Sequence, residues 1–504
     1  MFYNSTQDKS KAVLSAQAIA QGISQDGGLF VPESFPQITE EELKAMLSMS
    51  YQDRAKCIIA KYLTDFTEEE IADCVDSAYT VEKFGSENPA PIATVDFNGA
   101  ELNLLELWHG PTCAFKDMAL QILPHFLTKS LKKAGGGKDA VILVATSGDT
   151  GKAALEGFKD VDHTKIIVFY PVNGVSAMQK HQMNTQEGDN VYVCAIRGNF
   201  DDAQTAVKKI FTDTDTQAVL NEHNMMFSSA NSINWGRLLP QIVYYVSAYC
   251  DMVNKGKVAF GDKINITVPT GNFGNILAGY YAYQMGLPVK KFICASNSNN
   301  VLTDFIRTGV YNKNRDFYTT VSPSMDILVS SNLERLLYCL SGNNDVETKG
   351  YMDLLKTEGV YTVSAPLQDK LQSMFWGGYA DEDATKRTIH DLFEQQHYLC
   401  DTHTAVAVSV CDAYIRETGD KTPVVIASTA SPYKFSKAVL GALDQGKMPE
   451  SEFDMVEQLH KLTGAEVPAP LASLRGKQTR FSDVTDKEDM QSVVLGALGI
   501  DTNP

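Results

Sequence analysis

The sequence predicts an α/β fold with two parallel-sheet lobes, and three observations support this prediction. Short runs of β-branched and apolar residues are each followed by a helix-like run, which is typical of the βα units of a parallel sheet. These units occur in two sets along the chain, so we expect two lobes with a cleft between them. With 504 residues, of which 44% are hydrophobic, the chain is long enough for two or three domains with a large core.

The first part of the chain predicts a helical subdomain and a smaller α/β domain. Residues 1–94 are rich in helical periodicity, as in EEELKAMLSMSYQDRAKCIIAKYL, and turn signals at QDGGLFVP and ENPAP interrupt it. Residues 121–234 contain the first set of βα units: VILVAT before GKAALEGF, IIVFYP before VSAMQKHQM, and VYVCAI before DDAQTAVKKIF. We assign this segment to the smaller α/β domain.

The second set of units predicts a larger α/β domain made of residues 95–120 and 235–504. It contains INITVP before ILAGYYAYQMG, KFICAS before NVLTDFIRTG, and VVIAS before FSKAVLGAL. Within it, residues 326–420 have a mainly helical period, as in NLERLLYCL and ATKRTIHDLFEQQ. We expect this stretch to be a largely helical insertion.

Composition limits the partners and the compartment. Asp and Glu outnumber Lys and Arg by 62 to 44, for a net charge of −18, which disfavours a nucleic acid or an anionic membrane as partner. An anionic substrate would then need a locally positive pocket. The nine cysteines are scattered without the spacing of a zinc site, and no apolar run has the length of a signal peptide or membrane span. We therefore expect a cytoplasmic protein without a metal site.

The segment PTGNFGN, Pro269 to Asn275, stands between a strand-like run and a helix-like run. A glycine-rich turn at the start of a helix presents several backbone N–H groups, which can bind a phosphate. By itself such a turn is more often only a tight connection.

A second junction of the same kind is ATSGDTGKAA. Thr146, Ser147 and Thr150 could hold a carboxylate or phosphate there, or the segment could be an ordinary capped helix with Asp149 or Thr150 as the cap. The template of a nucleotide-binding P-loop is not met, because the upstream glycine is missing and alanine follows Gly151-Lys152.

The segment HGPTCAFKDMALQ places Lys116 between Phe115 and Asp117. A lysine in a dry site has a lowered pKa and can form an imine with an aldehyde cofactor, whereas a lysine without such context is usually a surface charge. Near the C-terminus, VVIASTASPYKF offers hydroxyls that could bind a heterocyclic nitrogen, with helix capping as the ordinary alternative. These hydroxyls belong to Ser428, Thr429 and Ser431.

Together with NSINWGRLLPQ and the opening QGISQDGGLFVPE, these segments resemble the motifs of threonine synthase, in the same order from about residue 22 to residue 435. The resemblance implies a fold type II enzyme dependent on pyridoxal 5'-phosphate (PLP), with Lys116 as the catalytic lysine that carries the cofactor. It implies that the phosphate of PLP is bound by Gly271, Asn272, Phe273, Gly274 and Asn275. Thr429 would face the pyridine nitrogen.

The resemblance also implies the reaction, in which O-phospho-L-homoserine and water give L-threonine and phosphate, the last step of threonine biosynthesis. It also implies that the substrate is bound by Ser147, Asp149, Thr150, Asn234 and Arg237. Arg237 is the best cation for the leaving phosphate because its guanidinium matches phosphate geometry, and we expect Lys180 and Arg197 behind it; a helix-surface ion pair is the other interpretation of Arg237. A carboxylate near anions is unfavourable unless it accepts hydrogen bonds or carries a proton, so the role of Asp149 stays open.

Two alternatives stay open beside threonine synthase. One is another fold type II lyase, such as a threonine or serine dehydratase, which would act on a substrate without the γ-phosphate. The other is a catalytically silent homologue, although such a protein would be expected to have lost Lys116. As for assembly, we expect a monomer or a homodimer.

Overall fold

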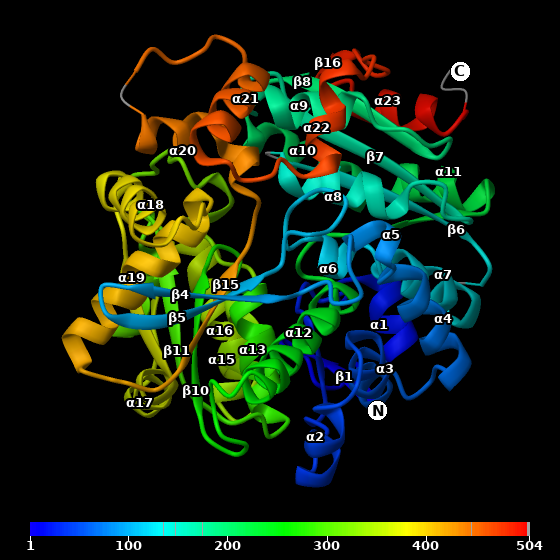
Figure 1. The fold of residues 1–504 in the computed structure, drawn as a ribbon. Coiled ribbons are helices and arrows are strands. Elements are labelled where there is room, and N and C mark those ends of the chain that lie inside the picture. The colour runs from blue at the N-terminus through cyan, green and yellow to red at the C-terminus, as the bar shows by residue number, and fades with distance from the viewer. Residues whose placement is uncertain (135, 147, 174, 445, 501–504) are drawn as a thin grey trace.

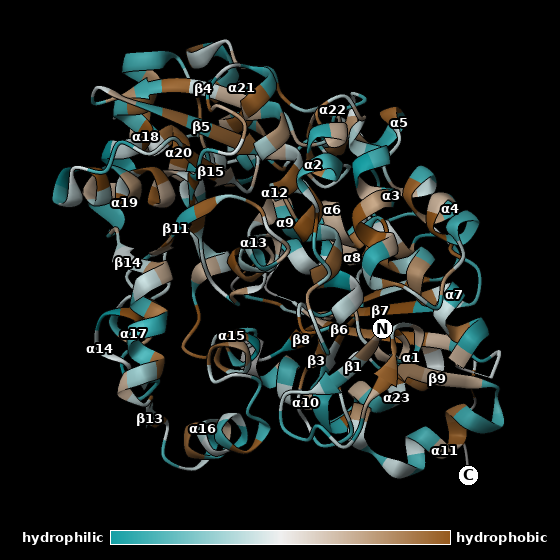
Figure 2. Ribbon diagram, turned by 90° about the horizontal axis from the view of Figure 1, so that it is seen from below, coloured by the Kyte–Doolittle hydropathy of each residue, from teal (hydrophilic) through white to brown (hydrophobic). Residues whose placement is uncertain are grey.

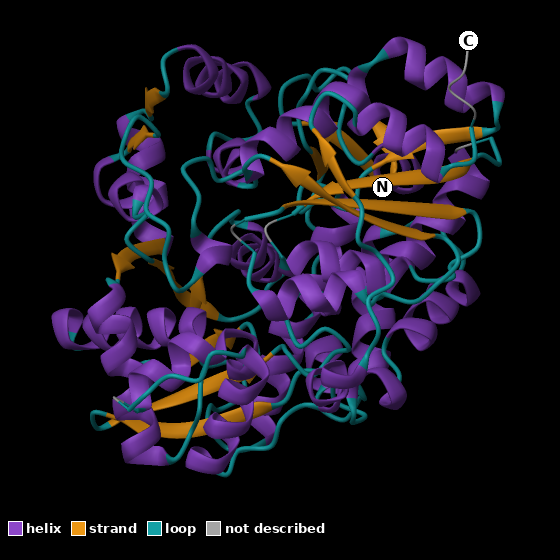
Figure 3. Cartoon of the chain, turned by 90° about the horizontal axis from the view of Figure 1, so that it is seen from above, coloured by secondary structure: helices purple, strands orange, loops and turns teal. Residues whose placement is uncertain are grey.

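The computed structural model describes residues 1–134, 136–146, 148–173, 175–444 and 446–500. Two sheets built mainly from parallel strands lie apart, each with helices on its faces, as Figure 3 shows. This arrangement confirms the predicted α/β fold class with two lobes.

The smaller lobe contains a five-stranded sheet with the order β16-β8-β7-β6-β9, in which every described pairing is parallel. Its central strands are continuous apolar runs because helices cover both faces. The strands are β6 (Asp139–Ala145), β7 (Thr164–Pro171), β8 (Val191–Arg197), β9 (Met225–Ser228) and β16 (Val484–Asp486). The helices are α7 (Leu123–Ala134), α8 (Asp149–Phe158), α9 (Ala177–Asn184), α10 (Phe200–Thr212) and α11 (Thr214–Glu222).

The C-terminal end of the chain returns to the smaller lobe, which corrects the assignment of all of 235–504 to the larger domain. Strand β16 pairs in parallel with β8, and helix α23 (Met490–Ala497) follows it. Met490 and Val494 are fully buried in an apolar cluster with residues of β6, β7, β8 and α10. In Figure 1 these red segments lie beside the green and cyan strands of that lobe.

The larger lobe contains a six-stranded sheet with the order β14-β11-β10-β15-β5-β4, parallel except for β4 against β5. The strands are β4 (Ile92–Phe97), β5 (Ala100–Glu106), β10 (Ile264–Pro269), β11 (Val289–Ser296), β14 (Phe375–Tyr379) and β15 (Val424–Ser428). Its helices include α6 (Asp117–Leu120), α12 (Trp235–Asn254), α13 (Gly274–Gln284), α14 (Val301–Thr308), α20 (Ser436–Leu443), α21 (Glu452–Thr463) and α22 (Ala469–Ala472). The short 3-10 helices are η1 (Pro323–Met325), η2 (Pro432–Phe435) and η3 (Ser473–Gly476).

The stretch 326–420 is mainly helical, as predicted, but it is not a separate insertion. It contributes β14 to the edge of the large sheet, and its last helix packs on β10, β11 and β15. A two-stranded ribbon pairs β12 (Val310–Asn312) with β13 (Val360–Thr362). The helices of the stretch are α15 (Leu333–Leu340), α16 (Asp345–Thr357), α17 (Ala365–Met374), α18 (Glu382–Gln396) and α19 (Thr402–Thr418).

The N-terminal region is helical, with a small antiparallel sheet in the order β2-β1-β3 in addition. It packs across both lobes, since α1 contacts α7 and α3 contacts α12. The strands are β1 (Phe2–Ser5), β2 (Val13–Leu14) and β3 (Phe30–Pro32). The helices are α1 (Ser15–Gln21), α2 (Glu40–Met46), α3 (Tyr51–Tyr62), α4 (Glu68–Ala78) and α5 (Val81–Phe84).

Helix α12 is the central element of the core. Nearly all of its residues are buried, and it lies among apolar elements in the middle of the view in Figure 2. It packs on α13, α3 and α6 and so joins the N-terminal region to the larger lobe. No helix in the described part of the chain is both long and apolar enough to span a membrane.

Candidate active site

Lys116 lies at the start of α6, next to the carboxyl end of β15. The backbone N–H of Phe115 donates to the carbonyl of Thr429 over 2.8 Å, which fixes this junction. The lysine is only 7% exposed. Its Nζ lies 3.4 Å from Ser324 Oγ, 3.6 Å from Asp149 Oδ2 and 4.7 Å from the centre of the Phe115 ring.

Burial lowers the pKa of Lys116 to about 8. The charge of Asp149 opposes this shift, whereas the positive charges of Lys434 and Arg237 add to it. A lysine with this pKa carries a substantial fraction of free amine near neutral pH, which is the form that attacks an aldehyde.

Asp149, the first residue of α8, lies between two lysines that come from the other lobe. Its Oδ1 is 2.8 Å from Lys434 Nζ and accepts a hydrogen bond from Gln179 over 2.9 Å, while its Oδ2 faces Lys116. Burial would raise the pKa of Asp149, but the charges of Lys434 and Lys116 outweigh it and hold that pKa well below its ordinary value. The carboxylate therefore accepts hydrogen bonds and is balanced by two lysines, which is one of the conditions under which a carboxylate can lie near anions.

Lys434, which the sequence analysis did not single out, completes this cluster. It belongs to η2, is 2% exposed, and also donates to the carbonyl of Thr112 over 2.8 Å. The sequence could have indicated Lys434, because this residue belongs to the segment STASPYKF, which is part of the family resemblance. Because Asp149 belongs to the smaller lobe and Lys434 to the larger, their ion pair joins the two lobes across the site.

The SGDTG turn is held by Thr146. Its Oγ1 accepts hydrogen bonds from the N–H groups of Gly148 at 3.0 Å and Gly151 at 2.9 Å. Gly148 is the N-cap of α8, so the alternative in which Asp149 or Thr150 caps the helix is wrong. Its φ is +141°, and a Cβ there would lie 2.5 Å from Gln179, so only glycine fits.

Of the two hydroxyls on this turn that are predicted to bind the substrate, the structure describes one. Thr150 is half-buried in the first turn of α8, and among the described residues its hydroxyl has no hydrogen-bond partner. Ser147 lies outside the described residues.

The turn of residues 271–275 connects β10 to α13, as predicted. In the described structure, no acceptor pairs with the backbone N–H groups of these five residues. Phe273 has a left-handed φ of 65° and caps the helix, while its buried ring packs on Phe375. The turn thus presents unpaired N–H groups at a helix N-terminus, as an anion site requires.

The surroundings of this turn also fit a phosphate. The Asn275 side-chain oxygen accepts hydrogen bonds from Tyr244 and Tyr245, but its buried Nδ2 has no partner in the described structure. A Cβ on Gly271 would lie 2.5 Å from the carbonyl oxygen of Ser324, so the turn and η1 are in direct contact. Asn272, which is exposed, has its carbonyl held by the side chain and backbone of Asn332, both at 3.0 Å.

Three buried hydroxyls lie at the end of β15 and just after it, and in the described structure only one makes no hydrogen bond. Ser428 Oγ accepts from Trp108 over 3.1 Å, and Ser431 Oγ accepts from the Tyr433 N–H over 3.4 Å. The Thr429 hydroxyl has no partner among the described residues, although its carbonyl is fixed next to Lys116. Thr429 is therefore the one of these three hydroxyls that no described residue engages, and its place at the pyridine nitrogen stays a prediction.

Arg237 is a buried cation whose charge no ion pair in the described chain balances. It is 5% exposed, donates to the Ala230 carbonyl over 2.9 Å, and forms no ion pair within the described chain. Burial lowers its pKa to about 10. The surface ion pair considered from the sequence is therefore absent from the described structure, and an unpaired buried guanidinium indicates an anion site.

Two other residues expected near Arg237 have different roles. Asn234 is fully buried; its amide donates to the carbonyls of Ile19 and Ser229, and its oxygen accepts from the N–H of Gly236. These contacts use its polar atoms to start α12, so Asn234 positions that helix. The expectation that Arg197 lies behind Arg237 is wrong. Its side chain is exposed and pairs with Asp486 over 3.0 Å at the edge of the smaller sheet.

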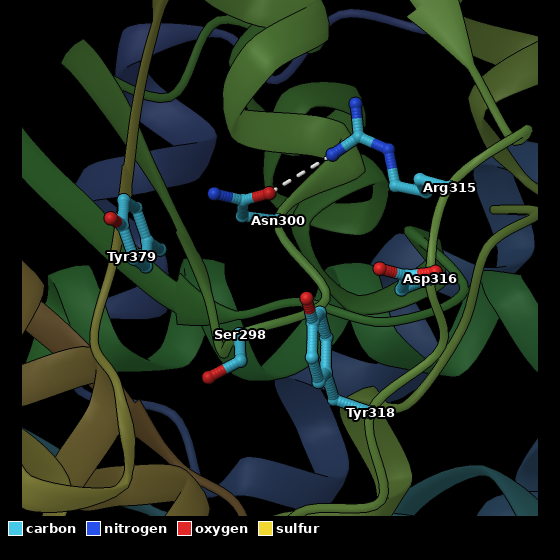
Figure 4. A pocket seen from close by; sticks show the side chains of 6 residues that line it. All are labelled: Ser298, Asn300, Arg315, Asp316, Tyr318 and Tyr379. Atoms are coloured by element: carbon cyan, nitrogen blue, oxygen red, sulfur yellow. Dashed lines mark hydrogen bonds between the residues drawn. The ribbon is translucent and has the colours of Figure 1, made fainter.

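A separate cavity of about 600 Å³ lies beyond the carboxyl ends of β11 and β14. Figure 4 shows its side chains around an open space, with Arg315 bonded to Asn300 over 3.0 Å. None of the residues predicted for the site lines this cavity. Its lining residues are Ser298, Asn300, Arg315, Asp316, Tyr318 and Tyr379.

The fold and the site together define a PLP-dependent enzyme of fold type II, and residues 86–365 match the family model of pyridoxal-phosphate dependent enzymes. Residues 2–79 match the model of the threonine synthase N terminus, and residues 404–494 match that of the threonine synthase C-terminal part. The chain belongs to the threonine synthase family.

Individual relatives agree with this family. The chain is 35% identical to threonine synthase of Saccharomyces cerevisiae, over 92% of this chain and 93% of the relative. It is 39% identical to human threonine synthase-like 1, over 92% of this chain but only 62% of that protein's length. The structure of PLP-bound threonine synthase from Brucella melitensis superposes with a TM-score of 0.87 at 35% identity, covering 99% of both chains.

Proposed function

We propose that the protein is a threonine synthase that converts O-phospho-L-homoserine and water to L-threonine and phosphate. One observation carries the proposal beyond the family: the buried side chains of Lys116 and Lys434 both face the carboxylate of Asp149, and the charge of Arg237 acts on Lys116. The buried carboxylates of Asp149 and Asp117 balance these three basic groups only in part. This excess of positive charge suits a substrate that brings a phosphate and a carboxylate. The strongly acidic chain thus has a local cluster of buried positive charge, as such a substrate needs.

The cofactor would be held by the residues already described. The free N–H groups of residues 271–275 and the Asn275 amide would bind its phosphate, Lys116 would bond to its aldehyde, and the Thr429 hydroxyl would face its ring nitrogen. When bound, PLP withdraws electrons from the amino-acid substrate and so makes its C–H bonds more acidic. A neutral hydroxyl at the ring nitrogen sets how strongly it does so.

Each step on the substrate then needs a group that moves a proton or binds an anion. The α-proton and a β-proton are removed, and phosphate leaves the γ-carbon. The γ-carbon is then protonated, water supplies a hydroxyl to the β-carbon, and the α-carbon regains a proton. Lys116 is the proton carrier, because its pKa of about 8 lets it take and return a proton near neutral pH. Arg237 binds the leaving phosphate, and Thr150 contributes a hydroxyl to the substrate.

Asp149 has a positioning role in this account. Its ionised carboxylate attracts the Lys116 amine from one side, while Lys434 and Gln179 hold it in place from the other. Two lysines balance its charge, so that it does not repel the anionic substrate. Ser147 is proposed for the substrate only on the basis of the family resemblance.

The test is a product assay with purified protein and PLP. Addition of O-phospho-L-homoserine should release phosphate and L-threonine in equal amounts, and Lys116→Ala should release neither. Phosphate without threonine would indicate another lyase of this family. Turnover of L-serine or L-threonine in place of the phosphorylated substrate would indicate a dehydratase.

A further inference from the structure

The short helix η1 lies between Lys116 and the turn of residues 271–275. The Lys116 amine donates to Ser324 Oγ over 3.4 Å. On its other side, the Ser324 carbonyl occupies the space that a Cβ on Gly271 would need, at 2.5 Å. A single residue, Ser324, therefore contacts both the reactive amine and the predicted phosphate site.

Ser324 is held in turn by His403, the second residue of α19. The ring is 3% exposed, and its Nε2 accepts the backbone N–H of Ser324 over 3.2 Å. A backbone N–H can only donate, so Nε2 carries no proton and the ring proton is on Nδ1. This Nδ1 lies 2.7 Å from Oδ2 of Asp401, which accepts the proton.

The surroundings of His403 fix the tautomer and the orientation of its ring. Asp401 is fully buried and also accepts the N–H groups of His403 and Thr404, so it cannot turn away. The ring of Phe435 packs edge-on against the imidazole at 4.8 Å. A buried polar pair stabilises a fold little, because desolvation offsets the attraction, but it fixes an orientation.

We propose that Ser324 orients the Lys116 amine, and that His403 and Asp401 are positioning residues that hold Ser324 in place. Around Nζ, the bond to Cε and the contacts with Ser324 and Asp149 occupy three directions. The fourth direction is left for the bond to the cofactor or for a proton in transit. The inference rests on the proposed role of Lys116 and adds one residue that contacts its amine and two that hold that residue in place.

The test measures how readily Lys116 reacts with an amine reagent as pH varies, in the full-length chain before PLP is added. The peptide that contains Lys116 is quantified by mass spectrometry. Ser324→Ala removes an acceptor that stabilises the charged amine. The midpoint of the curve of Lys116 labelling against pH should therefore fall by about 0.5 pH unit. His403→Phe keeps a ring but loses the acceptor, and should lower the midpoint similarly.

Two further variants separate positioning from packing. His403→Gln retains an acceptor for the Ser324 N–H and should restore the midpoint of the unchanged protein. The double variant Ser324→Ala/His403→Phe should show no larger shift than Ser324→Ala, because His403 acts through Ser324. Thermal unfolding of each variant checks that the fold is intact.

An unchanged midpoint in Ser324→Ala would overturn the proposal, as would shifts in the double variant that simply add. A midpoint for His403→Gln as low as that for His403→Phe would also contradict it. The readout needs neither cofactor nor product, so a failure to form threonine would count against the proposed function and leave this test unaffected.

Discussion

At the scale of residues, the site depends on a buried row of alternating charges: Lys116, Asp149 and Lys434. Asp149 raises the pKa of Lys116, and Lys434 lowers it. The two effects have opposite signs and can be measured separately.

We predict that Asp149→Asn lowers the pKa of Lys116 below about 8 and that Lys434→Met raises it above this value. The first change removes an opposite charge and the second removes a like charge. The pH dependence of Lys116 labelling measures both shifts. Arg197→Ala is the control, since Arg197 is an exposed cation away from the site. Shifts of the same sign in both variants would contradict this arrangement.

For Arg237 we predict a loss of kcat/KM for O-phospho-L-homoserine of about tenfold or more in Arg237→Ala, since a charge-assisted contact with phosphate is lost. Arg237→Lys should recover part of this loss, because it keeps the charge but not the two-pronged geometry. Inorganic phosphate should inhibit the alanine variant more weakly. Unchanged kinetics in Arg237→Ala would remove Arg237 from the substrate site.

Local pattern predicted some of these residues and could not predict others. Lys116 and the 271–275 turn could be found because each lies within one short segment with a recognisable chemistry. The partner of Asp149 is 285 positions away in sequence, and His403 meets Ser324 only because α19 packs on the large sheet. No local spacing predicts such contacts, so Ser324, His403 and the role of Lys434 required the structure.

At the scale of elements, the strand-turn-helix unit of β10 and α13 carries the predicted phosphate site. The sequence predicted this unit because an apolar run, a glycine turn and a helix follow one another directly. It did not predict that η1 covers the turn so closely. The carbonyl of Ser324 lies against the Cα of Gly271, and the side chains of Ser330 and Asn332 donate to carbonyls of the turn.

We predict that Gly271→Ala weakens PLP binding by about tenfold or more, because the added Cβ would meet the Ser324 carbonyl at 2.5 Å and push η1 away from the turn. Titration of PLP, followed by visible absorption, measures the change. Gly350→Ala in α16, where a Cβ meets nothing within 4 Å, is the matched control and should bind PLP normally. Equal binding by the two variants would show that the contact with η1 is not needed.

At the scale of the whole molecule, two lobes are joined by the N-terminal region, by α12 and by the Asp149–Lys434 ion pair. Periodicity predicted both lobes, because their units are regular and repeated. The return of the C-terminal segment to the smaller sheet was missed, since β16 has only three residues and pairs with β8 far back in the chain. A strand this short carries no reliable pattern.

We predict that Met490→Ala destabilises the smaller lobe by about 2 to 5 kcal/mol, as expected for a large-to-small change at a fully buried position. Hydrogen exchange should accelerate in β8 and α10 and stay unchanged in β10 and β15. Glu488→Ala, an exposed change two residues away, should have no effect. Equal acceleration in both lobes would contradict the assignment of α23 to the smaller one.

The role proposed for Lys116 is to carry the cofactor and to be released from it when the substrate binds. Borohydride reduction of the PLP-loaded protein, followed by peptide mass spectrometry, tests it most directly. We predict that the cofactor is found on the Lys116 peptide, and that O-phospho-L-homoserine added before reduction strongly decreases this label. A label on another lysine, or one that the substrate leaves unchanged, would contradict the account.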